Sequence, residues 1–170
     1  MTWFFAFLFC LLSQFAIADC EKYYLFNNEP RTLLKSLEHS TPGYFEKVTN
    51  KTSDGFFYFD GFRRVDENQE LGEILYKYFK KSDTLFISNL HVEIKGARIG
   101  SALLAKVLSE FPYVSRVKTV LGLDNFNAFM LAKGKGHSDI DALKMTPAYK
   151  MRKKMGFRVI SKKSIDIDLE

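Results

Sequence analysis

Cysteine is scarce in this chain of 170 residues, which contains only Cys10 and Cys20. Removal of the first eighteen residues leaves Cys20 alone, so no disulfide bond can then form within the chain. Cysteine usage therefore gives no support for an oxidising compartment. Repeats, low-complexity segments and flexible interdomain linkers are also missing, and the length suits one domain with a sizeable core.

Charge is absent from residues 1–18. This segment contains the apolar run WFFAFLFCLL, and AIA before Asp19 has the small-x-small form of a signal-peptidase site. We therefore predict a signal peptide at 1–18, cleaved after Ala18, then a domain spanning 19–170 of an exported, secreted or periplasmic protein. No Lys or Arg precedes the run, which is also short for a membrane span. One alternative is that the segment is an uncleaved membrane anchor. The other is that the start codon is misassigned, in which case the protein would be cytoplasmic.

Nucleic-acid modules and metal-ligand spacings are missing as well. The net charge of +5 produces a weak positive field that attracts phosphate groups. The sequence has no aromatic RNP pattern and no zinc finger, so we expect no nucleic-acid partner. His137 and Asp139 have no partners at metal-ligand spacing, so we expect no metal. We expect no membrane contact beyond the N-terminal segment, and the oligomeric state is not predicted.

Aromatic and β-branched runs dominate the first half of the domain. The segment 22–27 predicts a short strand, and EPRTLLKSLEHS predicts a helix with Leu33, Leu34 and Leu37 on one face. We interpret TPGYFEKV as a turn followed by helix or loop, and NKTSDG as a turn. Three runs separated by the turns DENQ and KKSD then predict an antiparallel meander: 56–65, 70–79 and 84–94.

The pattern changes to helical spacing at SALLAKVLSEF, and another strand candidate follows at 114–123. A strand, a crossover helix and a strand form a βαβ unit with parallel neighbours. Further helices are predicted in 125–136, 138–145 and 146–157, with Thr146, Pro147 and Gly156 as N-cap, first residue and stop. We predict an α+β domain with a mixed, mostly antiparallel sheet and one βαβ crossover, flanked by helices.

The turn KGARIGS joins the meander to the crossover helix. The start of a helix has four backbone N–H groups without intrahelical partners and a partial positive charge, so a phosphate fits there. Gly100 lets the backbone approach a ligand closely, and Lys95 and Arg98 add charge. The candidate donors are the amides of Arg98, Ile99, Gly100, Ser101 and Ala102. From the turn alone, an anion site and a structural corner are equally good interpretations.

The order of these elements resembles the GNAT superfamily of N-acetyltransferases. That family commonly has Arg or Gln, two residues, Gly, one residue, then Gly or Ala at this helix start. Lys95, Arg98 and Gly100 occupy the three places, so Arg98 replaces the first glycine. The family's next element is Asn, two residues, Ala, two residues, Leu. It is matched by Asn125, Ala128 and Leu131.

The resemblance implies that acetyl-CoA is a co-substrate, with its pyrophosphate on the amides of residues 98–102. The pantetheine arm would pair like an extra strand with the edge near His91, Val92 and Ile94. An N–H group near Val92 would polarise the thioester carbonyl, and Asn125 would cap the next helix or contact the cofactor.

The resemblance also requires proton transfers, because the amine loses a proton and the thiolate gains one. The family's usual Tyr position, counted back from Gly156, holds Arg152, and Tyr149 lies about one helical turn earlier. Tyr149 is therefore the candidate acid, or an ordinary core or surface tyrosine. Glu93 is the candidate base, with Glu73 and His91 as further candidates. Glu93 and Glu73 also have a simpler interpretation, namely strand residues whose side chains face solvent. The side chain of His91 would, more simply, face solvent or a neighbouring helix.

The predicted function is transfer of an acetyl group from acetyl-CoA to a primary amine. The alternative is an exported or anchored binding protein on a GNAT-like scaffold, with weak or no catalysis, because a fold does not fix a function. The acceptor and the acyl group stay open.

Overall fold

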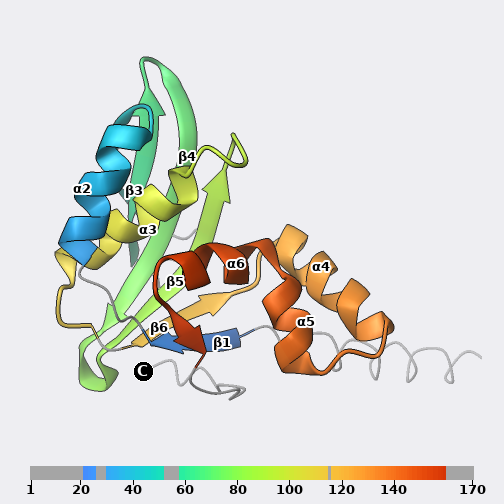
Figure 1. The fold of residues 1–170 in the computed structure, drawn as a ribbon. Coiled ribbons are helices and arrows are strands. Elements are labelled where there is room, and N and C mark those ends of the chain that lie inside the picture. The colour runs from blue at the N-terminus through green and yellow to red at the C-terminus, as the bar shows by residue number, and fades with distance from the viewer. Residues whose placement is uncertain (1–20, 26–29, 52–57, 115, 160–170) are drawn as a thin grey trace, which may run out of the picture.

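A computed structural model describes residues 21–25, 30–51, 58–114 and 116–159 (Figure 1). The predicted signal segment 1–18, both cysteines and most of the NKTSDG turn lie outside these ranges, as does most of FRVISKKSIDIDL, a run that also predicts a strand. Within the described ranges, no helix combines the length and apolar character that crossing a bilayer requires.

In the described part of the chain, seven strands form one mixed sheet in the order β2-β3-β4-β5-β6-β1-β7. The strands are β1 Glu21–Leu25, β2 Tyr44–Lys51, β3 Tyr58–Asp66, β4 Gln69–Phe79, β5 Thr84–Val92, β6 Arg116–Val120 and β7 Arg158–Val159. β5 and β6 are parallel, and the other five neighbouring pairs are antiparallel. The predicted fold class, including the meander and the parallel crossover pair, is confirmed.

The predicted helices are also confirmed, with small shifts at their ends. They are α2 Pro30–Ser40, α3 Ile99–Glu110, α4 Leu123–Gly134, α5 Asp139–Met145 and α6 Pro147–Lys154. Thr146 caps α6 as predicted, because its Oγ1 accepts a hydrogen bond from the Tyr149 N–H group at 3.2 Å. Gly156 follows α6 with a φ of 91°, a conformation that favours glycine.

The prediction of helix or loop after TPG is wrong, since Tyr44–Lys51 is strand β2. β2 pairs with β3 along its whole length, from Tyr44 opposite Val65 to Lys51 opposite Tyr58. Tyr, Phe, Val and Thr within β2 suit a half-buried sheet surface, and pairing with β3 decides the outcome over local propensity. The meander therefore has four strands instead of three.

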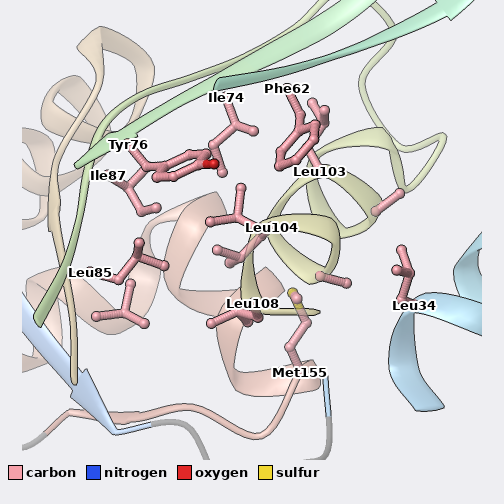
Figure 2. Packing of buried hydrophobic residues seen from close by; sticks show 14 of the residues in the cluster. Leu34, Phe62, Ile74, Tyr76, Leu85, Ile87, Leu103, Leu104, Leu108 and Met155 are labelled. Carbon is pink, nitrogen blue, oxygen red and sulfur yellow. The ribbon is translucent and has the colours of Figure 1, made fainter. Parts of the chain in front are cut away.

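One face of the sheet carries the main core, which is covered by α2, α3 and α6 (Figures 1 and 2). Leu103, Leu104 and Leu108 of α3 pack in the same core as the strand residues Ile74 and Leu85 (Figure 2). All five side chains are fully buried, at 0% exposure. A second, smaller cluster joins β6 to the later helices; it comprises Leu121, Phe129, Ala132, Ala142 and Leu143.

Truncation of Leu104 tests this packing. We expect Leu104→Ala to lower the free energy of unfolding by about 2–5 kcal/mol, because a fully buried leucine leaves a cavity. Leu131→Ala is the matched control, since Leu131 is 65% exposed and its truncation should cost less than about 0.5 kcal/mol. Urea denaturation measures both, and equal effects would show that α3 is not packed as described.

Candidate functional site

The pairing between the parallel strands β5 and β6 ends before β5 does. β5 pairs with β6 from Thr84 opposite Arg116 to Ile87 opposite Thr119. β6 then ends at Val120, whereas β5 continues to Val92 and is paired there, among the described strands, with β4 alone. We call this region, bounded by 88–92 of β5 and the end of β6, the fork. In sheets with parallel strands, ligands bind outside the carboxyl ends of those strands, which is where the fork opens.

A β-bulge marks the point where the strands part. Leu75 of β4 lies opposite Asn89 and Tyr76 opposite Ile87, so Ser88 is an extra residue in β5. Its Oγ donates a hydrogen bond to the Leu75 carbonyl at 3.2 Å. The extra residue changes which face the following side chains occupy, since side chains alternate along a strand.

The turn before α3 contains a strained residue. Arg98 is the N-cap of α3 with φ 61° and ψ 7°, the left-handed region. This conformation costs a non-glycine residue about 1–2 kcal/mol. A glycine would adopt this conformation without that cost. The Arg98 side chain is exposed and makes no cap hydrogen bond with the helix.

Four of the five predicted amide donors precede the first intrahelical hydrogen bond. They are those of Arg98, Ile99, Gly100 and Ser101. The prediction that Ala102 also donates to a ligand is wrong, because its N–H group bonds to the Arg98 carbonyl within the helix at 3.0 Å. The side chain of Ile99 is 1% exposed and belongs to the core, so only its backbone is available.

Gly100 packs the start of α3 against the fork. A Cβ atom at this position would lie 3.4 Å from Val92 Cγ1 and 3.4 Å from Met151 Sδ, which is ordinary van der Waals contact. The protein's own packing therefore does not require glycine at position 100. The same distances show that the helix start, the end of β5 and α6 are in contact at this point.

Lys95 reaches across the mouth of the fork to α4. Its Nζ lies 2.6 Å from Oδ2 of Asp124, in the first turn of α4. The hydrogen bond from Lys95, and then its charge, lower the pKa of the Asp124 carboxyl. Both side chains are mostly exposed. Lys95 is therefore engaged by a carboxylate in the turn where we predicted a phosphate contact, and the sequence did not indicate Asp124 as its partner.

Asn125 does not cap its own helix, contrary to one of our interpretations. The N-cap of α4 is Gly122, without a side-chain hydrogen bond. Instead, Asn125 Oδ1 accepts a hydrogen bond from the Ala148 N–H group at 2.8 Å, so it caps α6. This bond fixes the first turn of α6, which also carries Tyr149, relative to α4.

Tyr149 lies at the seam between the two cores. Its ring is half-buried and packs against both hydrophobic clusters. Three residues later, Arg152 is only 2% exposed, and its Nη2 donates to Thr119 Oγ1 at 2.9 Å. Thr119 is the last β6 residue paired with β5. A buried guanidinium therefore lies at the vertex of the fork.

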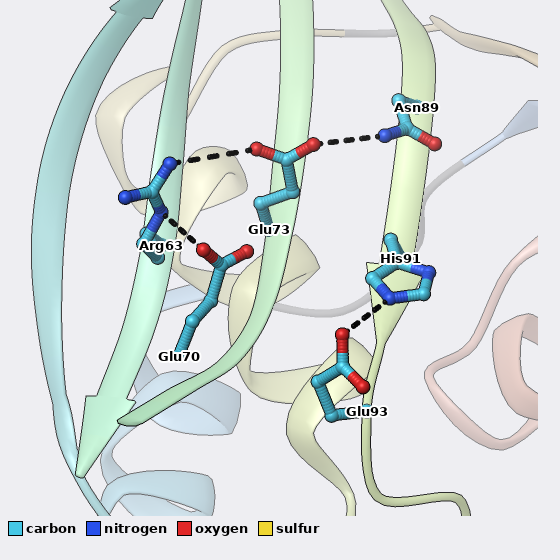
Figure 3. Close-up of polar contacts among 6 residues, drawn as sticks. All are labelled: Arg63, Glu70, Glu73, Asn89, His91 and Glu93. Carbon is cyan, nitrogen blue, oxygen red and sulfur yellow. Dashed lines mark hydrogen bonds and ion pairs between the residues drawn. The ribbon is translucent and has the colours of Figure 1, made fainter. Parts of the chain in front are cut away.

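The candidate bases lie on the sheet face opposite the main core (Figure 3). His91 Nε2 is 2.8 Å from Oε1 of Glu93, and both side chains are about half exposed, at 55% and 52%. Glu73 accepts a hydrogen bond from Asn89 at 3.1 Å and pairs with Arg63 at 4.0 Å. Glu73 is thus held between neighbouring strands, whereas His91 and Glu93 form an isolated pair that faces solvent.

The remaining candidates lie apart from these groups. Ile94, just after β5, is 47% exposed. Asp139 pairs with Lys133 at 2.6 Å. Across the described ranges, no three His, Cys, Asp or Glu residues are grouped so that they could hold a metal ion.

The sequence matches no known protein-family profile and no curated protein. Solved structures of similar fold include a functionally unknown conserved protein from Staphylococcus epidermidis, with TM-score 0.50, 11% identity and coverage of 84% of this chain and 58% of that one. A tandem GNAT protein from the clavulanic acid biosynthesis pathway gives TM-score 0.41, 15% identity and coverage of 78% and 51%. Nourseothricin acetyltransferase gives 0.29, 14% and coverage of 56% and 69%.

This chain spans little more than half the length of the first two of these proteins. At such low identities the likeness concerns the fold alone.

The ion pair across the fork gives a titration prediction. Lys95→Met should raise the pKa of Asp124 toward the usual value for aspartate, because the hydrogen bond and the charge that lower it are removed. Carboxyl carbon NMR shifts measured against pH report this directly. Lys144→Met is the matched control: it should raise the pKa of Asp141 and leave that of Asp124 unchanged. An unchanged Asp124 in the Lys95 variant would mean that the pair does not form in solution.

Proposed function

We propose that the protein is an N-acyltransferase that transfers an acetyl group from acetyl-CoA to a primary amine. The observation that carries this proposal is the fork itself. An unpaired strand edge on β5 runs directly into a left-handed turn and a helix start whose first four amides have no intrahelical partner. This combination suits a long ligand with an amide-containing arm and a pyrophosphate.

The backbone of the turn suits the pyrophosphate. The amides of Arg98 to Ser101 lie at the positive end of α3, and Arg98 is exposed beside them. Asp124 is the one unfavourable group, since its carboxylate lies at the same mouth. Lys95 offsets that charge in the free protein, and a bound phosphate would compete with Asp124 for Lys95.

The direction of the β5 backbone suits the arm of the coenzyme. The Glu93 N–H group donates to the Leu71 carbonyl of β4 at 2.9 Å. Successive N–H groups alternate between the two edges of a strand, so the N–H group of Val92 is directed toward the fork. There it is available to a strand-like ligand or to a developing oxyanion.

The coenzyme supplies an acyl group activated as a thioester. The protein must then accept a proton from the amine and supply one to the thiolate. The amine nitrogen attacks the carbonyl carbon, the C–S bond breaks, a base takes the amine proton and the thiolate acquires one. Glu93 is our candidate for the base, and His91, whose Nε2 lies 2.8 Å from Glu93 Oε1, is the further candidate in the same pair. Tyr149 is our candidate for the acid, since it is half-buried at the seam beside the fork.

Arg152 favours the alternative function, a binding protein with weak or no catalysis. An arginine does not give up its proton in the neutral pH range, so it cannot replace a tyrosine as general acid. The hydrogen bond from Arg152 to Thr119 and the near-complete burial of Arg152 are also consistent with a purely structural role for this residue. Acetyl-CoA binding without acetylation of any amine in a broad panel would support this alternative.

Coenzyme binding is tested by placing a negative charge among the amides. Millimolar acetyl-CoA should raise the melting temperature of the wild-type protein. Ser101→Asp should weaken acetyl-CoA binding by about tenfold or more, because its carboxylate repels the phosphates and a charge-assisted contact is worth about 1.5–3 kcal/mol. The same carboxylate is favourable at the start of a helix, so the substitution should not destabilise α3. Ser109→Asp, at the other end of α3, is the control and should bind normally. Absence of any wild-type shift would refute the proposal.

Catalysis is tested by removing the two proton-transfer groups one at a time. Tyr149→Phe and Glu93→Gln should each lower kcat by about 10²–10⁴-fold if they act as acid and base, with acetyl-CoA affinity unchanged. Glu73→Gln is the control for Glu93, since its carboxylate is held by Arg63 and Asn89. Steady-state acetylation over a pH series checks this. A Tyr149→Phe enzyme with full activity would exclude tyrosine as the acid.

A further inference from the structure

Helix α6 is too short for local forces alone to determine its place. It has eight residues, Pro147–Lys154. Isolated helices below about 12–15 residues are marginal in water, so tertiary contacts must hold such a helix. Its own N-cap is Thr146, whose Oγ1 accepts a hydrogen bond from the Tyr149 N–H group at 3.2 Å. That cap stabilises the helix but does not fix its place on the fold, because Thr146 and Tyr149 lie in the same segment of chain.

Two hydrogen bonds attach α6 to elements that border the fork. In its first turn, the Ala148 N–H group donates to Asn125 Oδ1 of α4 at 2.8 Å. In its last turn, Arg152 Nη2 donates to Thr119 Oγ1 of β6 at 2.9 Å. Tyr149 lies between these two attachment points along the helix. Both of them therefore determine where the ring of Tyr149 is held.

The hydrogen bond from Asn125 is a cap supplied by a different helix. The first N–H groups of a helix have no intrahelical partner, and side-chain oxygens can satisfy them. Thr146 satisfies one of these groups in α6, and Asn125 satisfies a second. The start of α4 itself has Gly122 as its N-cap, without a side-chain hydrogen bond. The oxygen of Asn125 is therefore used to join α4 to α6, and not to cap the helix that carries it.

Helix α6 also contacts the turn that we propose for the coenzyme. A Cβ atom at Gly100 would lie 3.4 Å from Met151 Sδ, so α6 packs against the start of α3. Through Asn125 it is attached to the start of α4 as well. Tyr149 is half-buried and packs against both hydrophobic clusters. A displacement of about 1 Å in a reacting group can lower a rate by about 10²-fold, so the attachment of α6 bears on catalysis.

We propose that Asn125 is a positioning residue that holds Tyr149 at the fork through the Ala148 N–H group. This inference rests on the proposed function, in which Tyr149 protonates the thiolate. It replaces the direct coenzyme contact that the family resemblance implied for Asn125. Asn125 neither touches the coenzyme nor transfers a proton in this account, and it affects kcat only through the place of Tyr149. The affinity for acetyl-CoA is then independent of Asn125.

The test compares three substitutions on α4, each made in the full-length wild-type protein and in Tyr149→Phe. Asn125→Ala removes the acceptor for the Ala148 N–H group. Asn125→Asp keeps an oxygen at the same position, and a carboxylate is favourable in the first turn of a helix. Asn127→Ala is the matched control, because Asn127 is an exposed asparagine two residues further along α4. Steady-state acetylation gives kcat, and calorimetry gives the dissociation constant of acetyl-CoA.

We expect Asn125→Ala to lower kcat by about 10–10²-fold while the dissociation constant of acetyl-CoA stays the same. Asn125→Asp and Asn127→Ala should retain most of the wild-type kcat. In Tyr149→Phe, Asn125→Ala should lower kcat no further, because the group that Asn125 positions is already gone. An equal loss of kcat in both backgrounds, or weaker acetyl-CoA binding in Asn125→Ala, would overturn the inference.

A fluorine label separates this inference from the proposed function. Fluorotyrosine replaces the eight tyrosines, and the fluorine NMR signal that is missing in Tyr149→Phe belongs to Tyr149. Asn125→Ala should shift or broaden this signal, and Asn127→Ala should not. The signal of Tyr76, which is 3% exposed in the main core, should stay in place and so report an intact fold. An unchanged Tyr149 signal in Asn125→Ala would overturn the inference, whereas a wild-type protein without activity would refute the proposed function alone.

Discussion

The extra residue in β5 is the constraint on which the rest of the site depends. Up to Ile87, β5 has partners on both sides, and its inward side chains Leu85 and Ile87 fill the core. Ser88 then takes an additional place in the ladder with β4, and pairing with β6 has ended. A bulge bends a strand and increases its local twist. The result is a strand that belongs to the core at one end and offers a free backbone edge at the other.

The same residue divides the side chains of the fork between two faces. After Ser88, Leu90 and Val92 pack against the main core, and His91 and Glu93 face solvent on the opposite side. Gly72 allows β4 to follow β5 closely at this end, because a Cβ there would lie 2.6 Å from the His91 carbonyl oxygen. The backbone edge and the helix start thus meet at the end of β5, where Gly100 lies close to Val92. Arg152 is buried at the vertex, where it donates a hydrogen bond to Thr119.

Much of the fold could be predicted from the sequence, because its strands alternate and its helices carry clear caps such as Thr146 and Pro147. β2 could not, since its identity depends on pairing with β3. The bulge could have been predicted from the spacing of the apolar residues Leu85, Ile87, Leu90 and Val92. A regular strand alternates every two residues, whereas Ile87 and Leu90 are three residues apart. For the candidate site, the turn and its amides followed from helix physics. The partners of Lys95, Asn125 and Arg152 did not, because each lies more than twenty residues away in sequence.

The central claim is that the amides before the first bond of α3 receive the phosphates of a coenzyme. Amide NMR spectra recorded during titration with acetyl-CoA test it most directly. We predict that the largest shift changes occur at Arg98, Ile99, Gly100 and Ser101, with smaller ones along 88–92. Asp83, a left-handed residue that immediately precedes β5, should not respond. Saturating acetyl-CoA that leaves the four amides unmoved, or moves only scattered surface lysines, would contradict the account.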